Sequence, residues 1–401
     1  MANAILSQLL QPQVVLRVIS RIREGQGFLG RFFGFQPDRF DPETVTLAGP
    51  NTLNSNSSVR NAVYRIFDAT RVVSKARAPG TGPAQVSVNP MAQANVSVAR
   101  FHQKIALEAE FLGNLSPMIG PNSTVDTAGQ DYIMRQETFM ARQFNNMIEM
   151  LTAGMCRDSL YYSISGDDWF PTFTSPTYGQ QVPFQIPSGN KSQLNMLGTG
   201  SIIGTSWANA GAPIMDDLAA IEAAYVQLSG YSMTDVLVNG ILMNKILQNT
   251  QIRNVGGSSN TVFAENDRSP TTFMDGQPGT YYNLVLRALP NIRFHVCNDV
   301  VALSTDIDPS YATAPAAATL AKLIPDTMAI FTTQPSSTWT QMYHGGEYVV
   351  EQPGSPFILR SGYYAWKEYV TQPSAVELLS LLNCVPLLYV PKAIAPATVV
   401  F

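Results

Sequence analysis

The sequence predicts an α+β fold organised around one long helix, and three observations lead to that prediction. The stretch from Thr127 to about Leu160 repeats apolar residues at the spacing of a single helical stripe. The region after Pro213 alternates helix, short strand and helix, which is typical of an α+β lobe. Strand-like segments lie both before the long helix and in the last third of the chain.

The composition indicates a folded protein that is poor in charge. The 401 residues are 45% hydrophobic and 13% charged, about half the usual charged share. We therefore expect other copies of the chain to cover much of its surface. No apolar run approaches the roughly 20 residues that span a bilayer. The N-terminus does not resemble a secretory signal, so we expect neither export nor contact with a membrane.

Cysteine and charge patterns narrow the setting further. The three cysteines are far apart and odd in number, which favours a reducing cytoplasm over a disulfide framework. Residues 1–160 carry 15 basic and 12 acidic side chains (+3), whereas 161–401 carry 10 and 17 (−7). The amino-terminal part is therefore the better candidate to face a polyanion.

The first 58 residues are interpreted as a helix followed by an arm. Residues 4–23 have the pattern of an amphipathic helix, with apolar residues on one side and arginines on the other. Packing of this helix on a neighbouring subunit is favoured over contact with a membrane surface or with nucleic acid. The segment 24–58 is broken by glycine and proline and cannot form its own core. Its isolated aromatic residues are therefore expected to be anchored elsewhere, as in an arm that extends over adjacent copies. These residues are Phe28, Phe32, Phe33, Phe35 and Phe40.

A long hairpin is predicted next, from strands at about Asn61–Lys75 and Ala94–Leu107. An isolated two-stranded hairpin is marginal in water, so this one needs a surface, for which a neighbouring copy is the best candidate. Arg65 and Arg71 lie in its first strand. The residues expected to shape its tip for contact between subunits are Pro79, Gly80, Gly82, Pro83 and Pro90.

The long helix is expected to begin at Thr127, where Gln130 completes a capping box. Some thirty helical residues would give a rod of roughly 45 to 50 Å. Its apolar stripe comprises Ile133, Met140, Phe144, Ile148, Leu151 and Met155. The other faces are expected to carry Arg135, Gln136, Arg142, Gln143, Asn145 and Asn146. A helix with so narrow a stripe should lie across one layer instead of being buried.

The rest of the chain reads as loops and then an α+β lobe. Residues 165–212 are loop-rich, with short strands at best. A helix from Pro213 to Ser229 should stop at Gly230. A strand at 235–239, a helix at 240–249 and a glycine-serine loop at 256–259 follow. Further strands are expected at 281–289, 292–298 and 327–332, in the alternating stretch 338–370, and a final apolar segment follows.

No arrangement of residues predicts catalysis, a metal site or a cofactor site. His102, His295 and His344 fall in three separate segments, and His295 with Cys297 is read as a pair of ordinary strand residues. Gly166, Asp167 and Asp168 are interpreted as an acidic turn rather than a polymerase metal site. Asp216, Asp217 and Glu222 are interpreted as residues of a helical first turn rather than a glycosidase cluster. We therefore expect a protein that is not an enzyme.

In this order, the parts resemble the major capsid protein of tailed double-stranded DNA phages, with the Hong Kong 97 type fold. The lambda-like branch is the nearest, because there an aromatic, proline-bearing arm, here RFFGFQPDRFDPETVTL, precedes an extended loop. The resemblance implies six parts: an N-terminal helix and arm (1–58), an extended loop (59–110), a peripheral domain (111–212) with its spine at about 128–160, an axial domain (213–335), return strands (336–372) and a C-terminal segment (373–401).

The resemblance also implies a function and partners. Subunits would assemble into pentamers and hexamers of an icosahedral shell around packaged double-stranded DNA, with a precursor shell that expands on maturation. A separate scaffolding protein, a portal and in some cases a decoration protein would take part, and assembly would occur in the host bacterial cytoplasm. Covalent crosslinking through Lys75 has no assignable partner in the sequence.

Arginines near the N-terminus would then face the DNA and offset its charge without reading its sequence. They are Arg17, Arg21, Arg23, Arg31 and Arg39. Two other classes stay open at this stage: a tail-tube or other ring-forming virion protein, and a cytoplasmic enzyme of unknown type. The tube protein has no use for a thirty-residue spine, and the enzyme is disfavoured by its scattered titratable residues.

Overall fold

The structure, a computed structural model, combines helices and strands in the α+β class that the sequence predicts. It describes residues 27–35, 61–67, 92–108, 127–165, 168–198, 200–255, 281–286, 289–302, 320–349, 358–361, 363–371 and 374–401. The helix expected at 4–23 lies outside these residues.

The chain divides into two compact units. We call residues 1–63, 95–149 and 342–386 the spine unit, and residues 64–94, 150–341 and 387–401 the lobe unit. The boundaries fall inside several elements, the long helix among them.

The long helix α5 runs from Thr127 to Arg157, close to the predicted bounds. Met140, Phe144, Ile148, Leu151 and Met155 of the predicted stripe are all buried. Burial extends beyond the stripe, because Ala141, Asn145 and most of 148–156 are buried as well. Asn145, which was expected on a face other than the apolar stripe, is therefore buried as well.

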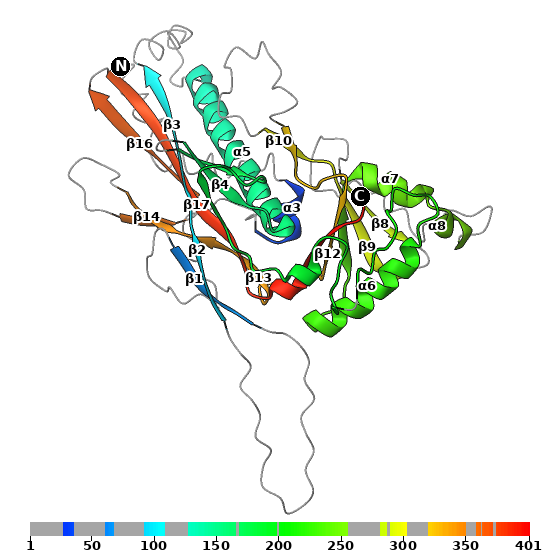
Figure 1. Ribbon diagram of the computed structural model, residues 1–401. Coiled ribbons are helices and arrows are strands. Elements are labelled where there is room, and N and C mark those ends of the chain that lie inside the picture. The colour runs from blue at the N-terminus through cyan, green and yellow to red at the C-terminus, as the bar shows by residue number, and fades with distance from the viewer. Residues whose placement is uncertain are drawn as a thin grey trace, which may run out of the picture. The chain divides into compact units, whose positions relative to one another are not determined.

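The main sheet of the spine unit is organised around one long strand. β17 (Ser374–Leu388) pairs antiparallel with β16 (Tyr363–Thr371) along one edge and with β3 (Arg100–Glu108) along the other, and the three run side by side in Figure 1. β13 (Thr340–His344) is the further neighbour of β17. β14 (Gly346–Val349) and β15 (Ile358–Ser361) form a separate antiparallel pair.

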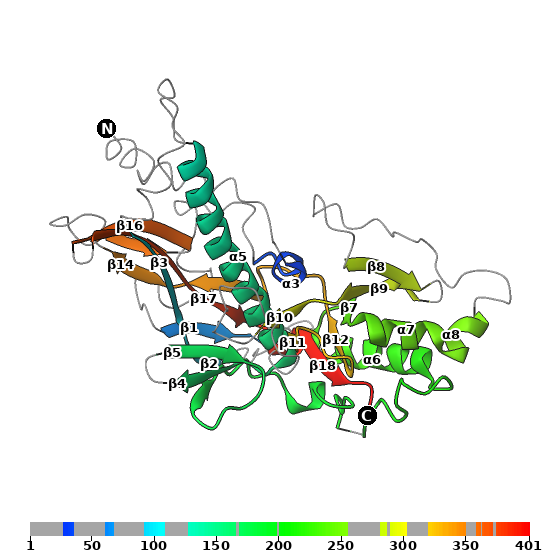
Figure 2. The same cartoon turned by 90° about the horizontal axis from the view of Figure 1, so that it is seen from above.

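One face of this sheet packs on α5, which Figure 2 shows alongside these strands. The rings of Phe144 and Tyr363 meet edge to face at 5.3 Å, and the Ser380 hydroxyl lies 3.3 Å from the Met140 sulfur. Residues two apart on a strand share a face, so Ser380 and Leu382 of β17 point toward the helix, while Leu379 and Leu381 point away from it. Both faces of β17 are buried at these positions.

The predicted hairpin is present at its base, but its second strand was predicted wrongly as one continuous element. β1 (Asn61–Ile66) pairs with β2 (Ala92–Ser97). The chain then leaves the strand at Val98 and Ala99, and resumes as β3 in a different sheet. Apolar alternation continues through the break, so the pattern alone could not locate it.

The lobe unit is built on a five-stranded mixed sheet with the order β18-β12-β7-β9-β8. The strands are β7 (Asp235–Val238), β8 (Tyr281–Leu286), β9 (Leu289–Cys297), β12 (Met328–Thr332) and β18 (Ile394–Thr398). β7 and β9 are parallel, and the other pairs are antiparallel. The strands predicted at 235–239, 292–298 and 327–332 are confirmed to within a few residues.

Three helices accompany this sheet. α6 (Ile214–Ser229) ends where predicted, at Gly230, whose φ of 72° lies in the left-handed region that glycine adopts readily. α7 (Gly240–Gln248) begins at an asparagine cap, since the Asn239 side chain accepts the Ile241 N–H. α8 (Thr250–Val255) was not predicted.

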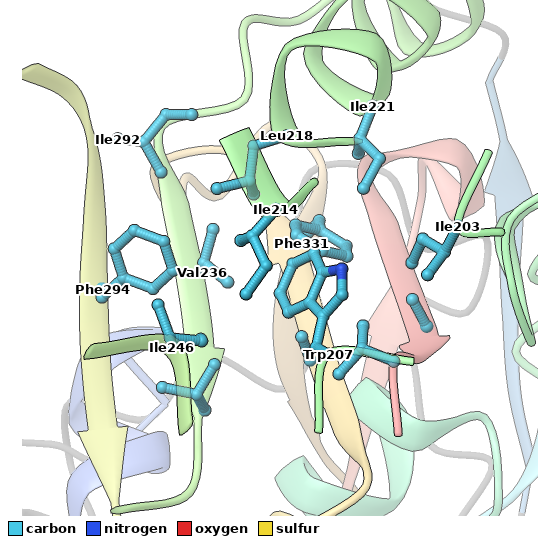
Figure 3. Packing of buried hydrophobic residues seen from close by; sticks show 14 of the residues in the cluster. Ile203, Trp207, Ile214, Leu218, Ile221, Val236, Ile246, Ile292, Phe294 and Phe331 are labelled. Atoms are coloured by element: carbon cyan, nitrogen blue, oxygen red, sulfur yellow. The ribbon is translucent and has the colours of Figure 1, made fainter. Parts of the chain in front are cut away.

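The core of the lobe unit gathers residues from α6, α7, α8 and the sheet, with loop residues such as Trp207. Figure 3 shows Trp207, Phe331 and Ile214 converging, and the Trp207 and Phe331 rings meet nearly at right angles, 6.3 Å apart. The Trp207 Nε1–H donates to Asp217, which anchors the loop to α6.

Smaller elements complete the lobe unit. β4 (Tyr161–Ser165) lies between β5 (Asp168–Thr172) and β6 (Gly179–Gln181) in a three-stranded antiparallel sheet. β10 (Val300–Ala302) pairs with β11 (Leu320–Lys322). Short 3-10 helices occupy Ser188–Asn190 and Pro391–Ala393.

Candidate assembly surfaces

A short piece of the predicted arm forms a helix that is fastened to the spine. α3 (Phe28–Phe32) presents its first backbone N–H groups to the Glu149 side chain of α5. Leu29 N–H and Gly30 N–H donate to the two carboxylate oxygens, at 2.8 and 2.6 Å. The first N–H groups of a helix have no partner within the helix, and a negative charge there is favourable. Glu149 is buried, so this contact holds residues 27–35 on α5.

The backbone around α3 leaves no room for larger residues at one position. A Cβ atom at Gly27 would lie 2.1 Å from Cγ and Cδ of Glu149, far inside van der Waals contact. After the helix, Gly34 has a φ of 69° and turns the chain, and Phe35 N–H bonds back to Gly30 O at 2.7 Å. The glycine-rich sequence predicts an irregular segment here, whereas the structure forms a short helix at Phe28–Phe32.

The arm aromatics pack on one another. Phe28 stacks on Phe32 at 5.8 Å, Phe32 meets Phe33 edge to face at 5.0 Å, and Phe33 stacks on Phe35 at 5.5 Å. Phe33 and Phe35 are about 5% exposed within the single chain, and Phe32 is half-buried. Phe40 lies outside the described residues. The contact of Phe32, Phe33 and Phe35 with other copies stays a prediction.

The base of the hairpin is packed against other residues of the chain. Ala62, Tyr64, Ala94 and Val96 are buried, whereas Arg65 on β1 is exposed. The Tyr64 and Tyr389 rings lie 5.8 Å apart, and Phe67 N–H donates to Tyr389 O at 2.8 Å. Burial raises the pKa of the Tyr64 hydroxyl, so this tyrosine stays neutral. The remaining predicted contact residues of the hairpin, Arg71, Pro79, Gly80, Gly82, Pro83 and Pro90, lie outside the described residues.

The face of the spine sheet that points away from α5 has an apolar centre with a charged border. Tyr364, Trp366, Leu379 and Leu381 cluster there, and the His102 ring stacks on Trp366 at 5.4 Å. On β3, Arg100, His102 and Lys104 are two residues apart and share this face. Their charges are partly balanced, because Arg100 pairs with Glu347 at 3.3 Å and Lys104 with Glu377 at 3.2 Å.

Of the arginines predicted to approach DNA, the structure describes one. Arg31 lies on α3 and is partly exposed. Arg17, Arg21, Arg23 and Arg39 lie outside the described residues, so the DNA-facing role stays a prediction. Lys75 lies outside them too.

Asp235 and His295, one of the histidines considered as a metal ligand, are joined by a hydrogen bond inside the fold. His295 Nε2 lies 2.6 Å from Asp235 Oδ1, and the Thr234 hydroxyl lies 2.5 Å from Asp235 Oδ2. Burial opposes ionisation of Asp235, but these hydrogen bonds outweigh it and leave its pKa below the ordinary value. His295 and Cys297 share a strand face, yet His295 is engaged by Asp235 and Cys297 is buried.

The acidic residues at the start of α6 serve the fold as well. Asp217 accepts from Trp207 at 2.9 Å, and Asp216 accepts from the Gln251 amide at 2.9 Å. Burial raises the pKa of Asp217, although the Trp207 hydrogen bond lowers it in part. Within the described residues, no three His, Cys, Asp or Glu side chains are grouped to hold a metal ion. The side chains of the predicted acidic turn at 166–168 are not among those described.

Sequence reasoning missed two features that the structure brings forward. Glu149 sits in an otherwise apolar turn of α5, IEMLTAGM, and a lone acid in such a turn was a signal for a buried partner. The second feature is an exposed apolar row on the sheet β5-β4-β6, formed by Ile164, Trp169 and Tyr178. In the described part of the chain, no helix is long and apolar enough to cross a bilayer.

Comparisons by sequence and by structure differ in outcome. No protein-family model matches the chain, and no curated protein sequence matches it. By structure, it is similar to a phage-related protein from Bordetella bronchiseptica RB50, at 10% identity and a TM-score of 0.47, over 96% of this chain and 95% of that one.

Two further solved structures are similar over most of their length. A putative capsid protein of a prophage in E. coli CFT073 is 12% identical, with a TM-score of 0.46, over 77% of this chain and 79% of that one. The mature capsid of bacteriophage PhiM1 is 10% identical, with a TM-score of 0.41, over 86% and 82%.

Proposed function

We propose that this chain is the structural subunit of a phage capsid shell of the Hong Kong 97 type. One observation carries the proposal. β3 follows the hairpin strands directly, and it pairs along its length with β17, a strand from the last thirty residues, in a sheet that packs on the 31-residue helix α5. An arm segment, a hairpin base, a spine helix, an α+β lobe and returning strands therefore follow one another in the order that the capsid resemblance implies.

The chemistry of the described residues supports a structural role over a catalytic one. The buried titratable side chains join elements of the fold: Glu149 holds the arm helix, Asp217 holds the Trp207 loop, and Asp235 joins β7 to β9 through His295. The three cysteines are buried. Groups engaged in this way are not available as a nucleophile or base.

Assembly follows from the same features. A chain with an arm, a hairpin and few charges can contact several neighbours, and many moderate interfaces add by multivalency. We extend the proposal to pentamers and hexamers of an icosahedral shell around double-stranded DNA. Arg31 and the arginines near it in sequence would lie on the inner face. A separate scaffolding protein, a portal and a decoration protein are the partners that such a shell uses, and the host cytoplasm is the place of assembly.

Electron microscopy of the purified chain, expressed with its genetic neighbours, tests the function directly. Closed shells of uniform size are the expected result. Stacked tubes would instead indicate a tail-type protein, and small discrete oligomers that never close would contradict a shell subunit. A map of the shell would also place Arg31, and a position on the outer surface would contradict the proposed contact with DNA.

A further inference from the structure

Three apolar side chains form a row across the sheet β5-β4-β6. Ile164 on β4 is paired directly with Trp169 on β5, and on its other side Ile164 N–H donates to Tyr178 O at 3.1 Å. Residues directly opposite in an antiparallel pair project to the same face, so the three side chains lie together. They are 36%, 40% and 77% exposed, which makes this an uncovered apolar surface on the chain.

The row is held in place by the sheet. Tyr162 lies two residues before Ile164, so it shares that face, and it is fully buried. Its ring lies 5.9 Å from that of Trp169. Val182 N–H donates to Leu160 O at 2.9 Å, and this bond closes the sheet at the other end. The exposed row is therefore a positioned extension of a packed core, not a set of loose side chains.

The chemistry of the surrounding residues selects the kind of partner. Residues 161–182 contain no lysine, arginine or histidine, so a polyanion finds no counter-charge there. Their exposed polar residues are mostly hydroxyl and amide side chains, such as Thr177 and Gln180. The charged residues of 161–182 are Asp167 and Asp168, and the others are uncharged. Aromatic residues with mostly uncharged polar neighbours are typical of a protein-protein interface.

The size of the row selects which protein. With about 150 to 250 Å² for a whole aromatic side chain, the exposed parts of the three residues add to about 300 Å². A stable two-protein complex needs about 800 Å² per partner. The row is too small to hold a free partner alone, and it suits a neighbour that other contacts already hold in place. In a shell of identical subunits, that neighbour is another copy.

We propose that the row Ile164, Trp169 and Tyr178 is buried against a second copy of this chain in the assembled particle. This inference rests on the proposed function and deepens it, because it names one of the surfaces through which copies meet. Tyr178 contributes the most, since it is the most exposed of the three.

Cysteine labelling tests this contact, because the natural cysteines Cys156, Cys297 and Cys384 are all buried. Tyr178→Cys is reacted with a maleimide dye in dissociated subunits and in assembled particles. We expect the labelling rate to fall at least tenfold on assembly. Gln181→Cys is the matched control, since Gln181 lies in β6 just after Tyr178, is exposed, and is paired with Tyr161, whose side chain is on the other face of the sheet from Ile164. Its labelling should fall less than that of Tyr178→Cys.

A charge at the same place provides a second readout. Tyr178→Glu should raise the subunit concentration needed for assembly by about tenfold or more, because a contact of hot-spot strength is repeated at every subunit. Tyr178→Phe should assemble as the unmodified chain does, and so should Gln181→Glu. The thermal unfolding of dissociated Tyr178→Glu should match that of the unmodified chain, so that misfolding is not the cause.

The outcomes separate this inference from the function beneath it. If particles form and Tyr178→Cys labels equally fast in subunits and in particles, the contact is refuted while the shell function stands. If Tyr178→Glu and Gln181→Glu assemble alike, the contact is again refuted. If the unmodified chain closes no particle with its genetic neighbours present, the function and the contact are refuted together.

Discussion

In the lobe unit, the buried side chains of Asp217, Asp235, Asn239 and Asn249 all have hydrogen-bond partners. In the spine unit, both amide atoms of Asn145 and Nδ1 of His344 are buried without one among the described residues. A buried polar group left unpaired costs about 1 to 3 kcal/mol. Within the lobe unit, the buried polar side chains around the five-stranded sheet are thus paired, although the Ser159 hydroxyl and Oδ1 of Asp326 elsewhere in that unit are buried without a partner among the described residues. The spine unit, in contrast, bears this cost where its helix packs on its main sheet.

This difference predicts that the two units respond differently to mutation and to pH. The lobe unit should fail when its apolar core is opened. The spine unit should lose stability when a buried polar group that has partners is changed. It should gain stability when an unpaired buried polar group is replaced by an apolar one. Hydrogen exchange measured by mass spectrometry on dissociated subunits reports on the two units separately.

The largest effect is expected for Trp207→Ala in the lobe unit. Trp207 is fully buried, and its removal leaves a large cavity and an unpaired Asp217 carboxylate. The free energy of unfolding of the lobe unit should fall by about 4 kcal/mol or more, measured in urea. Trp169→Ala is the matched control, since Trp169 is 40% exposed, and it should cost far less. Equal losses for the two tryptophans would contradict the placement of the core.

Glu149→Gln should be the most damaging single polar change in the spine unit. The carboxylate accepts two backbone N–H groups, whereas a glutamine amide accepts with one atom and sets a donor against the other N–H. The loss should be about 2 to 3 kcal/mol. It should appear as faster hydrogen exchange at Leu29 and Gly30. Glu222→Gln on α6 changes the same charge at a partly exposed site and should leave that exchange unchanged.

Acid should weaken the spine unit first, through His344. Burial lowers the pKa of His344 to about 4, so between about pH 6.5 and pH 4 the unfolded chain binds a proton that the folded chain does not. Stability therefore falls as the pH falls through that window, by about 3 kcal/mol. His344→Gln should remove this slope. A slope that persists in His344→Gln would assign it to other groups.

Over the same pH window, the pair of Asp235 and His295 in the lobe unit should keep its contribution to stability. Asp235 has a lowered pKa, so the stability it contributes is present above the pKa of an unfolded aspartate and is lost only as the pH falls toward the folded value. Asp235→Asn should bring a loss of stability at neutral pH that shrinks at lower pH.

The smallest effect expected is a gain. Asn145→Leu replaces a buried, unpaired amide with an apolar side chain of similar size, next to the apolar stripe of α5. The free energy of unfolding should rise by about 1 kcal/mol. Asn146→Leu is the control, because Asn146 is exposed and should change little. A loss of stability in Asn145→Leu would mean that a bound water pairs with the amide.

Much of the fold could be predicted where local sequence decides the structure. The helical stripe located α5 to within three residues at its end, and Gly230 ended α6. The sequence could not show that the predicted second strand of the hairpin is two strands, β2 and β3, because the break at Val98 and Ala99 is apolar and keeps the strand pattern. Only the pairing of β3 with β17, far along the chain, reveals it.

Two other features were missed for physical reasons of their own. α8 follows α7 after one residue, and its cap, Asn249, looked like the end of a single helix; its side chain accepts Gln251 N–H at 2.9 Å. Among the predicted assembly residues, the arm aromatics and the hairpin base pack against residues of the same chain. Contacts between copies depend on a second chain. A single sequence carries no direct signal for those contacts.

The pairing of β3 with β17 has a consequence for synthesis on the ribosome. Between Glu108 and Ser374 lie 265 residues (374 − 108 − 1), so the first strand must wait for the second. At about 5 to 20 residues per second, that wait is about 13 to 53 s. During it, the edge of β3 that β17 will cover is open to strands of other nascent chains on the same messenger. A chaperone that shields β3 during translation would therefore raise the yield of subunits more than one added after release.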